Sequence, residues 1–178
     1  MSSGPEIKYA VKFKVGADYS IGIFDDSSSL REQINHLEIG GQLLGSSDFK
    51  FRMSGTRTAK QACQIIILHN SKVYFWDWTS QAREPQFSIT SPVPGAVDFR
   101  TTRNSDKIMT FFTPSSIVAV SIFEANKKVI EATGLTNVPG FDLCFQTGVN
   151  PFRVLMMYND GGLVRSQEFN QDTGFQNK

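Results

Sequence analysis

Pairs of short apolar runs, each pair joined by a polar turn, recur at nearly constant intervals along the chain. Within each run apolar and polar side chains tend to alternate, which is the pattern of a β-strand. The turns are rich in Asn, Asp, Gly, Pro and Ser and centre near Ser27, Asn70, Ser115 and Gly161, at spacings of 43, 45 and 46 residues. A fixed period in this range is typical of a repeat architecture. The sequence therefore predicts four copies of one supersecondary unit.

Each unit is predicted to contain four antiparallel strands, of which the central two form the hairpin across the turn. The hairpins are predicted at residues 19–24 with 30–35, 63–68 with 72–78, 107–112 with 117–123, and 152–158 with 163–169. A preceding strand is expected within residues 7–15, 46–53, 93–100 and 138–146. A following strand is expected within residues 36–44, 85–90, 128–133 and 173–178.

Four short strands repeated about every 45 residues describe a propeller blade, so we expect an all-β, β-propeller-like fold. One blade cannot bury both of its faces alone, and blades therefore stack radially. A β-sandwich is the alternative, because strands at this spacing also permit two packed sheets. A β-trefoil is disfavoured, because it requires a threefold repeat. The 178 residues are predicted to form a single domain of four units, with approximate boundaries 7–45, 46–92, 93–137 and 138–178.

Charge and the N-terminal sequence exclude several classes of partner. The net charge is +1 and the lysines and arginines are scattered, so there is no basic field to hold a nucleic acid. The N-terminal residues lack the uninterrupted apolar stretch of a signal peptide, and no run approaches the ~18 apolar residues of a membrane span. We therefore expect a soluble protein, either cytoplasmic or secreted without a signal peptide.

Residues suited to catalysis or metal binding are sparse. His36 and His69 are the two histidines, and neither has metal-ligand spacing to a cysteine or to the other histidine. No nucleophile elbow, phosphate-binding loop or Rossmann fingerprint occurs. Cys63 and Cys144 fall in apolar runs and are expected to be buried free thiols, although a disulfide would require only that they are neighbours in space. We expect no catalysis, no metal and no cofactor.

The first unit, YSIGIFDDSSSLREQINHLEIGGQLLGS, resembles a blade of the fungal fucose-binding lectins. Those blades run as a strand, a polar turn, an Ile-x-Glu strand and a Gly-Gly-x-Leu-Gly stretch. The segments GGQLLG at 40–45, VPG at 93–95 and 138–140, and FRVLMMYNDGGLVR at 152–165 fit the same template. The resemblance implies a lectin-like propeller whose sugar ligand lies between blades.

The resemblance also implies a set of ligand-binding residues. In such lectins an arginine of the second strand and a glutamate of the third bind the sugar hydroxyls, while aromatic rings cover the apolar sugar face. Carried over by position, these roles fall on Arg153 in the fourth unit and Glu32 in the first. If the four units closed into a ring, these two residues would share one junction. The predicted ligand-binding set is Arg153, Glu32, Trp78, Tyr158 and Trp76.

The stretch NSKVYFWDWTS, residues 70–80, contains the only two tryptophans of the chain. Strand alternation places Tyr74, Trp76 and Trp78 on one face and Val73, Phe75 and Asp77 on the other. Trp76, in the middle of the strand, is expected to pack in the core against the next blade. Trp78, at the end of the strand and nearer a rim, is the better candidate for stacking on a ligand.

These features favour a non-catalytic, carbohydrate-binding protein that recognises neutral glycans between blades. The alternative is a propeller that serves as a protein–protein interaction scaffold, for which a near-neutral charge and many aromatic side chains are equally suitable. A third reading is a four-bladed propeller that binds a small molecule. The expected partners are glycans or a protein, and a homo-oligomer is compatible with a ring completed by another copy.

Overall fold

The computed structural model describes most of the chain, and the described residues are 7–25, 27–54, 64–78, 80–104, 107–113, 116–121, 127–133, 143–149, 152–160, 162–170 and 172–177. The chain divides into two compact units. Unit 1 comprises Met1–His69 and Tyr74–Ser88, and unit 2 comprises Asn70–Val73 and Ile89–Lys178.

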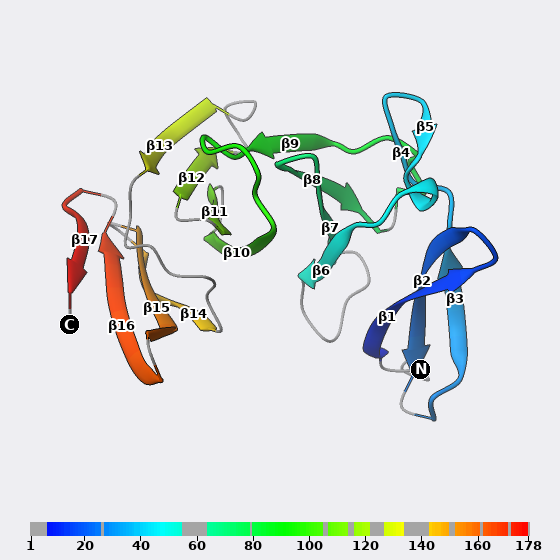
Figure 1. The fold of residues 1–178 in the computed structure, drawn as a ribbon, viewed down its shortest axis with the longest axis horizontal. Helices are drawn as coiled ribbons and strands as arrows, with labels where there is room; N and C mark the ends of the chain where they lie inside the picture. The colour runs from blue at the N-terminus through cyan, green and yellow to red at the C-terminus, as the bar shows by residue number, and fades with distance from the viewer. Residues whose placement is uncertain are drawn as a thin grey trace, which may run out of the picture. The chain divides into compact units, whose positions relative to one another are not determined.

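The fold is all-β, as predicted, and its strands form four meandering antiparallel sheets and one small hairpin (Figure 1). The first sheet contains β1 (Ile7–Val15), β2 (Asp18–Asp25) and β3 (Leu30–Ile34), and β4 (Glu38–Ile39) pairs with β5 (Gln42–Leu43). The second sheet contains β6 (Lys50–Ser54), β7 (Gln64–His69), β8 (Lys72–Asp77) and β9 (Phe87–Thr90). The third contains β10 (Asp98–Asn104), β11 (Lys107–Thr113), β12 (Ser116–Ser121) and β13 (Lys127–Thr133), and the fourth contains β14 (Leu143–Val149), β15 (Phe152–Asp160), β16 (Leu163–Asn170) and β17 (Gly174–Asn177).

A single 3-10 turn, η1 (Leu44–Ser46), is the helical element of the described residues. Within that part of the chain, no helix is long and apolar enough to cross a membrane. Each of the four sheets lies within one of the residue ranges predicted for the four units.

All four predicted hairpins are present, as β2–β3, β7–β8, β11–β12 and β15–β16. The β7–β8 turn consists of Asn70 and Ser71, both with positive φ, at 50° and 60°. Two such residues are typical of a type I′ turn, whose twist matches that of the flanking strands. The Ser71 hydroxyl also accepts hydrogen bonds from the backbone N–H groups of Gly95 (2.9 Å) and Ala96 (3.2 Å), which fixes the turn to the segment before β10.

The first sheet has three strands, so the fourth strand predicted within residues 36–44 is wrong. That segment instead turns back on itself as β4 and β5, with Gly40 and Gly41 at the turn (φ 61° and 76°). Glycine adopts this left-handed backbone without the penalty that a Cβ imposes. The Glu84 carboxylate accepts hydrogen bonds from the backbone N–H groups of Gly40 (3.1 Å) and Gly41 (2.6 Å). A side chain from the loop after β8 therefore stabilises a hairpin where local pattern favours a strand.

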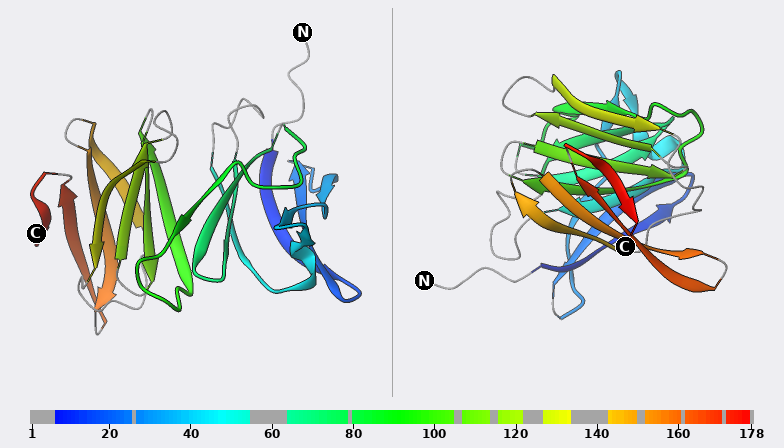
Figure 2. Two further views of the ribbon diagram at one scale, coloured as in Figure 1. Left: turned by 90° about the horizontal axis from the view of Figure 1, so that it is seen from above. Right: turned by 90° about the vertical axis from the view of Figure 1, so that its left-hand side faces the viewer.

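Unit 1 has a continuous apolar core built from residues of the first and second sheets. Its members are Ile21, Ile23, Ile34, Leu37, Leu44, Phe49, Ile65, Ile67, Trp76 and Trp78. Figure 2 shows the strands of these sheets in two further views. Lys12 of β1 donates a hydrogen bond to the Phe49 carbonyl oxygen (2.7 Å) and forms an ion pair with Asp48. The first strand of the first sheet is thereby tied to the segment that enters β6.

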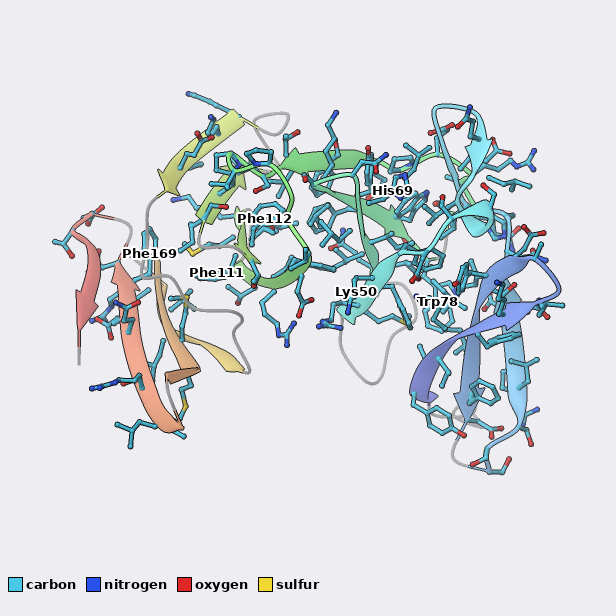
Figure 3. The ribbon with its side chains drawn as sticks, in the orientation of Figure 1. Lys50, His69, Trp78, Phe111, Phe112 and Phe169 are labelled. Atoms are coloured by element: carbon cyan, nitrogen blue, oxygen red, sulfur yellow. The ribbon has the colours of Figure 1, made fainter. Side chains whose placement is uncertain are left out.

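In unit 2 the third and fourth sheets lie next to each other through their first strands, β10 and β14. The second strand of the third sheet is buried on both faces, and Phe111 and Phe112 leave β11 on opposite sides (Figure 3). On β15 of the fourth sheet, Val154 and Met156 are buried while the residues that alternate with them are half-buried. Phe169, directly opposite Val154 on β16, completes the buried face.

Truncating one core side chain of unit 1 tests this packing. Ile67 is fully buried in the cluster, so we expect Ile67→Ala to lower the free energy of unfolding by about 2–5 kcal/mol. Val164→Ala, at a highly exposed position of β16, should change it by less than about 0.5 kcal/mol. Urea titrations followed by tryptophan fluorescence measure both, because the two tryptophans lie in this cluster. Equal stability of the two variants would contradict the core assignment.

Candidate functional site

Glu32 and Trp78 meet in unit 1, where the third strand of the first sheet faces the end of β8. On β3, Glu32 stands opposite Ile23 and shares the inward face of the sheet with it, whereas the preceding residue, Arg31, is largely exposed. The Trp78 indole N–H donates a hydrogen bond to the Glu32 carboxylate (3.0 Å). Trp78 lies between the strands of the two sheets (Figure 3). A carboxylate and an indole that are 46 positions apart thus form one polar contact in an otherwise apolar junction.

A shallow pocket surrounds this contact. Its volume is about 260 Å³, measured with its open mouth, and its lining is Glu32, Ile34, His36, Leu37, Ile65, Trp76, Asp77, Trp78, Gln81 and Ala82. The lining combines a carboxylate, an imidazole, an amide and two indoles with an aliphatic floor. Such a mixture of apolar surface and a few convergent polar groups is typical of a small-ligand site.

Both tryptophans are buried, which corrects the expectation that Trp78 offers an open stacking surface at a rim. Their exposed fractions are 1% for Trp76 and 5% for Trp78. Trp76 donates its indole N–H to the Arg83 carbonyl oxygen (2.9 Å), so each buried indole has an acceptor. Tyr74 is partly buried against the same cluster as Trp76 and Trp78. The three side chains therefore lie on one face of β8 and its extension, as strand alternation predicts. The rings close the side of the pocket as part of the core.

The loop between β8 and β9 is held against the β4–β5 hairpin by a small polar network. The Arg83 carbonyl oxygen accepts a second hydrogen bond from the backbone N–H of Glu38 (2.7 Å), and the Arg83 guanidinium forms an ion pair with the Glu38 carboxylate (2.9 Å). Glu84 holds the Gly40–Gly41 turn of the same hairpin. Because these contacts flank Trp76, they fix the wall of the pocket on the side of the second sheet.

Gln81 lies in this loop and lines the pocket. Its backbone is in the left-handed region, at a φ of 50°. Left-handed conformations are uncommon for residues other than glycine and persist where surrounding contacts impose them. Here the turn is held by Ser80, whose backbone N–H and hydroxyl both donate to the Asp77 carbonyl oxygen (3.3 and 3.0 Å), while the hydroxyl accepts from the Ala82 N–H (3.2 Å). These contacts hold the backbone of Gln81 in place at the pocket.

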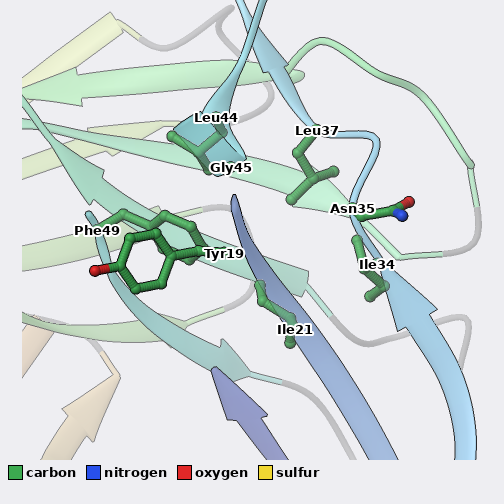
Figure 4. Close-up of a pocket in the computed structure, with 8 residues that line it drawn as sticks. All are labelled: Tyr19, Ile21, Ile34, Asn35, Leu37, Leu44, Gly45 and Phe49. Atoms are coloured by element: carbon green, nitrogen blue, oxygen red, sulfur yellow. The ribbon is translucent and has the colours of Figure 1, made fainter. Parts of the chain in front are cut away.

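A second, more apolar pocket lies on the inward side of the first sheet near η1 (Figure 4). Its volume is about 210 Å³ with its mouth, and its lining is Tyr19, Ile21, Ile34, Asn35, Leu37, Leu44, Gly45 and Phe49. The Tyr19 and Phe49 rings meet edge to face with centroids 6.1 Å apart. A Cβ on Gly45 would stand 2.8 Å from the Tyr19 carbonyl oxygen, so the close approach of η1 to β2 requires glycine. Since Asn35 and Tyr19 are its only polar side chains, this pocket offers little to a ligand beyond apolar contact.

Asp25 organises the polar turn between β2 and β3. Its carboxylate accepts hydrogen bonds from the Ser27 hydroxyl (2.7 Å), the Ser27 N–H (2.9 Å) and the Ser29 N–H (3.0 Å), and it forms an ion pair with Arg31. The Ser27 hydroxyl above all, with the Ser29 N–H and the Arg31 guanidinium, lowers the pKa of Asp25 to about 2, against the effect of burial, which raises it. The turn is thus an Asx-type structure fixed by one ionised carboxylate.

Two other groups of unit 1 have shifted pKa values. The Lys12 ammonium, hydrogen-bonded to Asp48, lowers the pKa of that carboxyl. Burial raises the pKa of the Tyr74 hydroxyl. Across the described residues, no three side chains of His, Cys, Asp or Glu gather closely enough to hold a metal ion.

Arg153 and Tyr158, the remaining predicted ligand residues, belong to the fourth sheet. Arg153 stands opposite Asn170 on β16, and its Nε is buried without a hydrogen-bond acceptor among the described residues. An unsatisfied buried N–H costs about 1–3 kcal/mol. Arg153 belongs to unit 2 and Glu32 to unit 1, so their shared junction stays a prediction. The side chain of Tyr158 lies outside the described residues.

The structure therefore brings Glu32, Trp76 and Trp78 together in one pocket, with three polar neighbours that sequence reasoning missed. His36 carried a usable signal, because positions 32, 34 and 36 alternate toward one face. Gln81 carried none, since the loop after β8 has no periodic pattern. Asp77, the last residue of β8, was assigned by strand alternation to the face opposite the tryptophans, yet it lines the same pocket. The predictions for Cys63 and for the side chain of Cys144 fall outside the described residues.

Comparisons with known proteins assign no family. No family model matches the chain, and no curated protein matches it. Among solved structures, a match is a crystal structure of the eukaryotic initiation factor, with a TM-score of 0.46 and 15% identity over 99% of this chain. The chain covers 56% of that protein's length. None of these comparisons bears on the resemblance to fucose-binding lectins, which stays a prediction.

The Asp25 turn should make stability depend on pH in the acid range. Because the folded pKa is about 2 against an ordinary 3.8, its contribution is complete above about pH 5 and is lost as the pH falls through 3.8 toward 2. We expect Asp25→Asn to be less stable than the native chain at pH 7 and to lose less stability between pH 4 and pH 2. Urea midpoints at these pH values measure this, with Asp18→Asn, an exposed aspartate of the same strand, as the control. Parallel pH profiles for the native chain and Asp25→Asn would contradict the assignment.

A double-mutant cycle tests the Glu32–Trp78 contact. We expect Trp78→Phe to lower the free energy of unfolding by about 2 kcal/mol, because it removes a hydrogen bond to a charged group as well as packing area. In the Glu32→Gln background the same change should cost less, by about 1 kcal/mol. Unfolding followed by circular dichroism gives the four stabilities. A cycle without coupling would show that the hydrogen bond contributes nothing to stability.

Proposed function

We propose that this chain is a non-catalytic binding protein that recognises neutral, hydroxyl-rich ligands, glycans above all, at the pocket around Glu32. The observation that carries the proposal is the position of Glu32, whose carboxylate lies at the junction of two sheets with one oxygen bonded to Trp78. A carboxylate that accepts from sugar hydroxyls is a strong and directional contact. The carboxamide of Gln81 and the imidazole of His36 add donors and acceptors around the same pocket.

The enclosed space of the pocket is small. It is about 10 Å³, room for about one water molecule, so a ligand would lie across the mouth of the pocket rather than inside it. Glu32 and Asp77 in the lining disfavour an anionic ligand by charge repulsion. Among the described residues, no three side chains of His, Cys, Asp or Glu gather to hold a metal ion. A neutral monosaccharide unit at the end of a glycan, lying across the mouth of the pocket, would avoid the charge repulsion.

The same proposal extends to architecture, for which a β-propeller-like arrangement of four blades is supported by three features. The sheets are sequential antiparallel meanders of three or four strands. The first strands of the third and fourth sheets are neighbours, and Lys12 ties β1 to the entrance of β6. Adjacent first strands are what radial stacking of blades requires.

A protein-interaction scaffold is the second candidate, and one observation favours it. The outward face of the first sheet exposes large apolar side chains at Tyr9, Val11, Val15 and Leu30. Clustered apolar surface on one face is characteristic of a protein interface. This face lies on the opposite side of the strands from Glu32, so the two functions do not exclude each other. A small-molecule ligand at the Glu32 pocket is the third candidate.

A glycan array followed by calorimetry tests the proposal. We expect binding to a neutral glycan and a roughly ten- to hundredfold weaker affinity for Glu32→Gln, since a hydrogen bond to a charged group contributes about 1.5–3 kcal/mol. Glutamine can still accept the Trp78 N–H, so this variant should keep the fold. Glu131→Gln, at an exposed glutamate of unit 2, is the matched control and should bind as the native chain does. The proposal fails if no glycan binds or if Glu32→Gln binds equally well.

A further inference from the structure

One wall of the Glu32 pocket is a surface segment rather than a part of the core. Gln81 and Ala82 line the pocket from the segment 80–84, which follows β8. Every side chain of this segment is exposed, whereas the apolar residues that line the pocket from the strands are buried. Segments with few buried apolar contacts open at a lower free-energy cost than the strands beneath them. The segment 80–84 is therefore the wall of the pocket that can move while the sheets stay intact.

Polar contacts at the surface hold this segment against the β4–β5 hairpin. The Glu84 carboxylate accepts hydrogen bonds from the backbone N–H groups of Gly40 (3.1 Å) and Gly41 (2.6 Å). The Arg83 guanidinium lies 2.9 Å from the Glu38 carboxylate, and the Arg83 side chain is 63% exposed. Exposed ion pairs contribute little to stability and weaken as the salt concentration rises. These two contacts form a latch that salt can loosen.

The same segment also occupies a hydrogen-bond donor of a pocket residue. The Arg83 carbonyl oxygen accepts hydrogen bonds from the Trp76 indole N–H (2.9 Å) and from the Glu38 backbone N–H (2.7 Å). When the segment moves away, the indole N–H loses this acceptor and turns into a donor for a bound molecule. The segment in its closed position therefore stands where a ligand acceptor would stand at Trp76.

The space inside the pocket is that of a closed state. It is about 10 Å³, room for about one water molecule. The exposed fractions of Trp76 and Trp78 are 1% and 5%, so their rings offer no open face for stacking. Closure also has a conformational cost, because Gln81 is held at a φ of 50°, in the left-handed region that residues other than glycine rarely adopt. The closed state thus admits a ligand at its mouth alone, and opening relieves strain.

We propose that residues 80–84 are a lid over Trp76 and Trp78, and that release of the latch opens it. In the open state both indole rings and the Trp76 N–H face the pocket, which suits the apolar face and the hydroxyls of a sugar ring. Because a ring can stack on the indoles in the open state alone, ligand affinity is reduced by the fraction of chains that are open. A looser latch therefore raises affinity. Opening is a property of the chain itself, and only its effect on affinity rests on the proposed function.

Quenching of tryptophan fluorescence by acrylamide tests the lid without any ligand, because Trp76 and Trp78 are the only tryptophans of the chain. We expect Glu84→Ala to raise the quenching constant at least about twofold, since local opening exposes both rings. About 1 M NaCl should raise it in the native chain, because salt screens the latch. Glu131→Ala, which removes the exposed Lys128–Glu131 ion pair of unit 2, is the matched control and should leave quenching unchanged.

A disulfide in place of the ion pair gives a locked form of the same protein. The backbone hydrogen bond between Glu38 and Arg83 brings these residues within reach of a disulfide. Glu38→Cys with Arg83→Cys, in a background where Cys63 and Cys144 are replaced by serine, should therefore lock the lid on oxidation. The oxidised form should resist quenching at any salt concentration, and the reduced form, which lacks the ion pair, should be quenched more than the native chain. Glycan affinity should be about tenfold weaker in the oxidised form than in the reduced form.

Each result decides between the lid and its alternatives. Equal quenching of the oxidised, reduced and native chains would overturn the lid, and so would a rise in Glu131→Ala that matches the rise in Glu84→Ala. Circular dichroism and urea midpoints check that every variant is folded. Equal glycan affinity of the oxidised and reduced forms would overturn the control of binding by the lid. If neither form binds any glycan, the proposed function fails, and the quenching measurements still decide whether the lid opens.

Discussion

The packing of one sheet face against the next is the constraint on which the rest of this structure depends. A meander of three or four short strands cannot bury two apolar faces by itself. Consecutive residues of β7, Ile66 and Ile67, are both buried, which is possible only for a strand whose sheet is covered on both sides. The repeat of about 45 residues matters because each repeat supplies one such sheet. Hairpins and turns set the spacing, and face-to-face burial provides the stability.

The candidate site is a consequence of the same packing. Trp78 is large enough to span the junction between the first and second sheets, but its indole N–H must find an acceptor when it is buried. Glu32 supplies that acceptor from the inward face of β3. The carboxylate therefore accepts a hydrogen bond from a core side chain and also forms part of the pocket lining. The structural role and the proposed binding role would fall on the same residue.

Local pattern predicted the elements of this fold, and contacts distant in sequence decided where it was wrong. The alternation of apolar residues located all four hairpins, and Asn70 in the predicted turn has the positive φ that a two-residue turn needs. The segment around Gly40 was expected to be a strand, but the Glu84 carboxylate, 43 and 44 positions away, holds it as a separate hairpin. Trp78 was expected near a rim because it ends its strand. It is buried instead, and its indole N–H bonds Glu32 on a strand of another sheet. Neither partner is visible in a window of ten residues.

The two proposed interactions use opposite faces of the same three strands. On β2, Ile23 points into the core beside the Glu32 pocket, while Phe24 next to it belongs to the outward apolar face. A sheet transmits little between its faces unless its strands shift, because alternate side chains pack independently on either side. Ligand binding at Glu32 and docking of a protein partner on the outward face should therefore be energetically independent. A measurable effect of one on the other would require that the register of β2 and β3 changes, and the bulge between Ile23 and Phe24 is where such a change would begin.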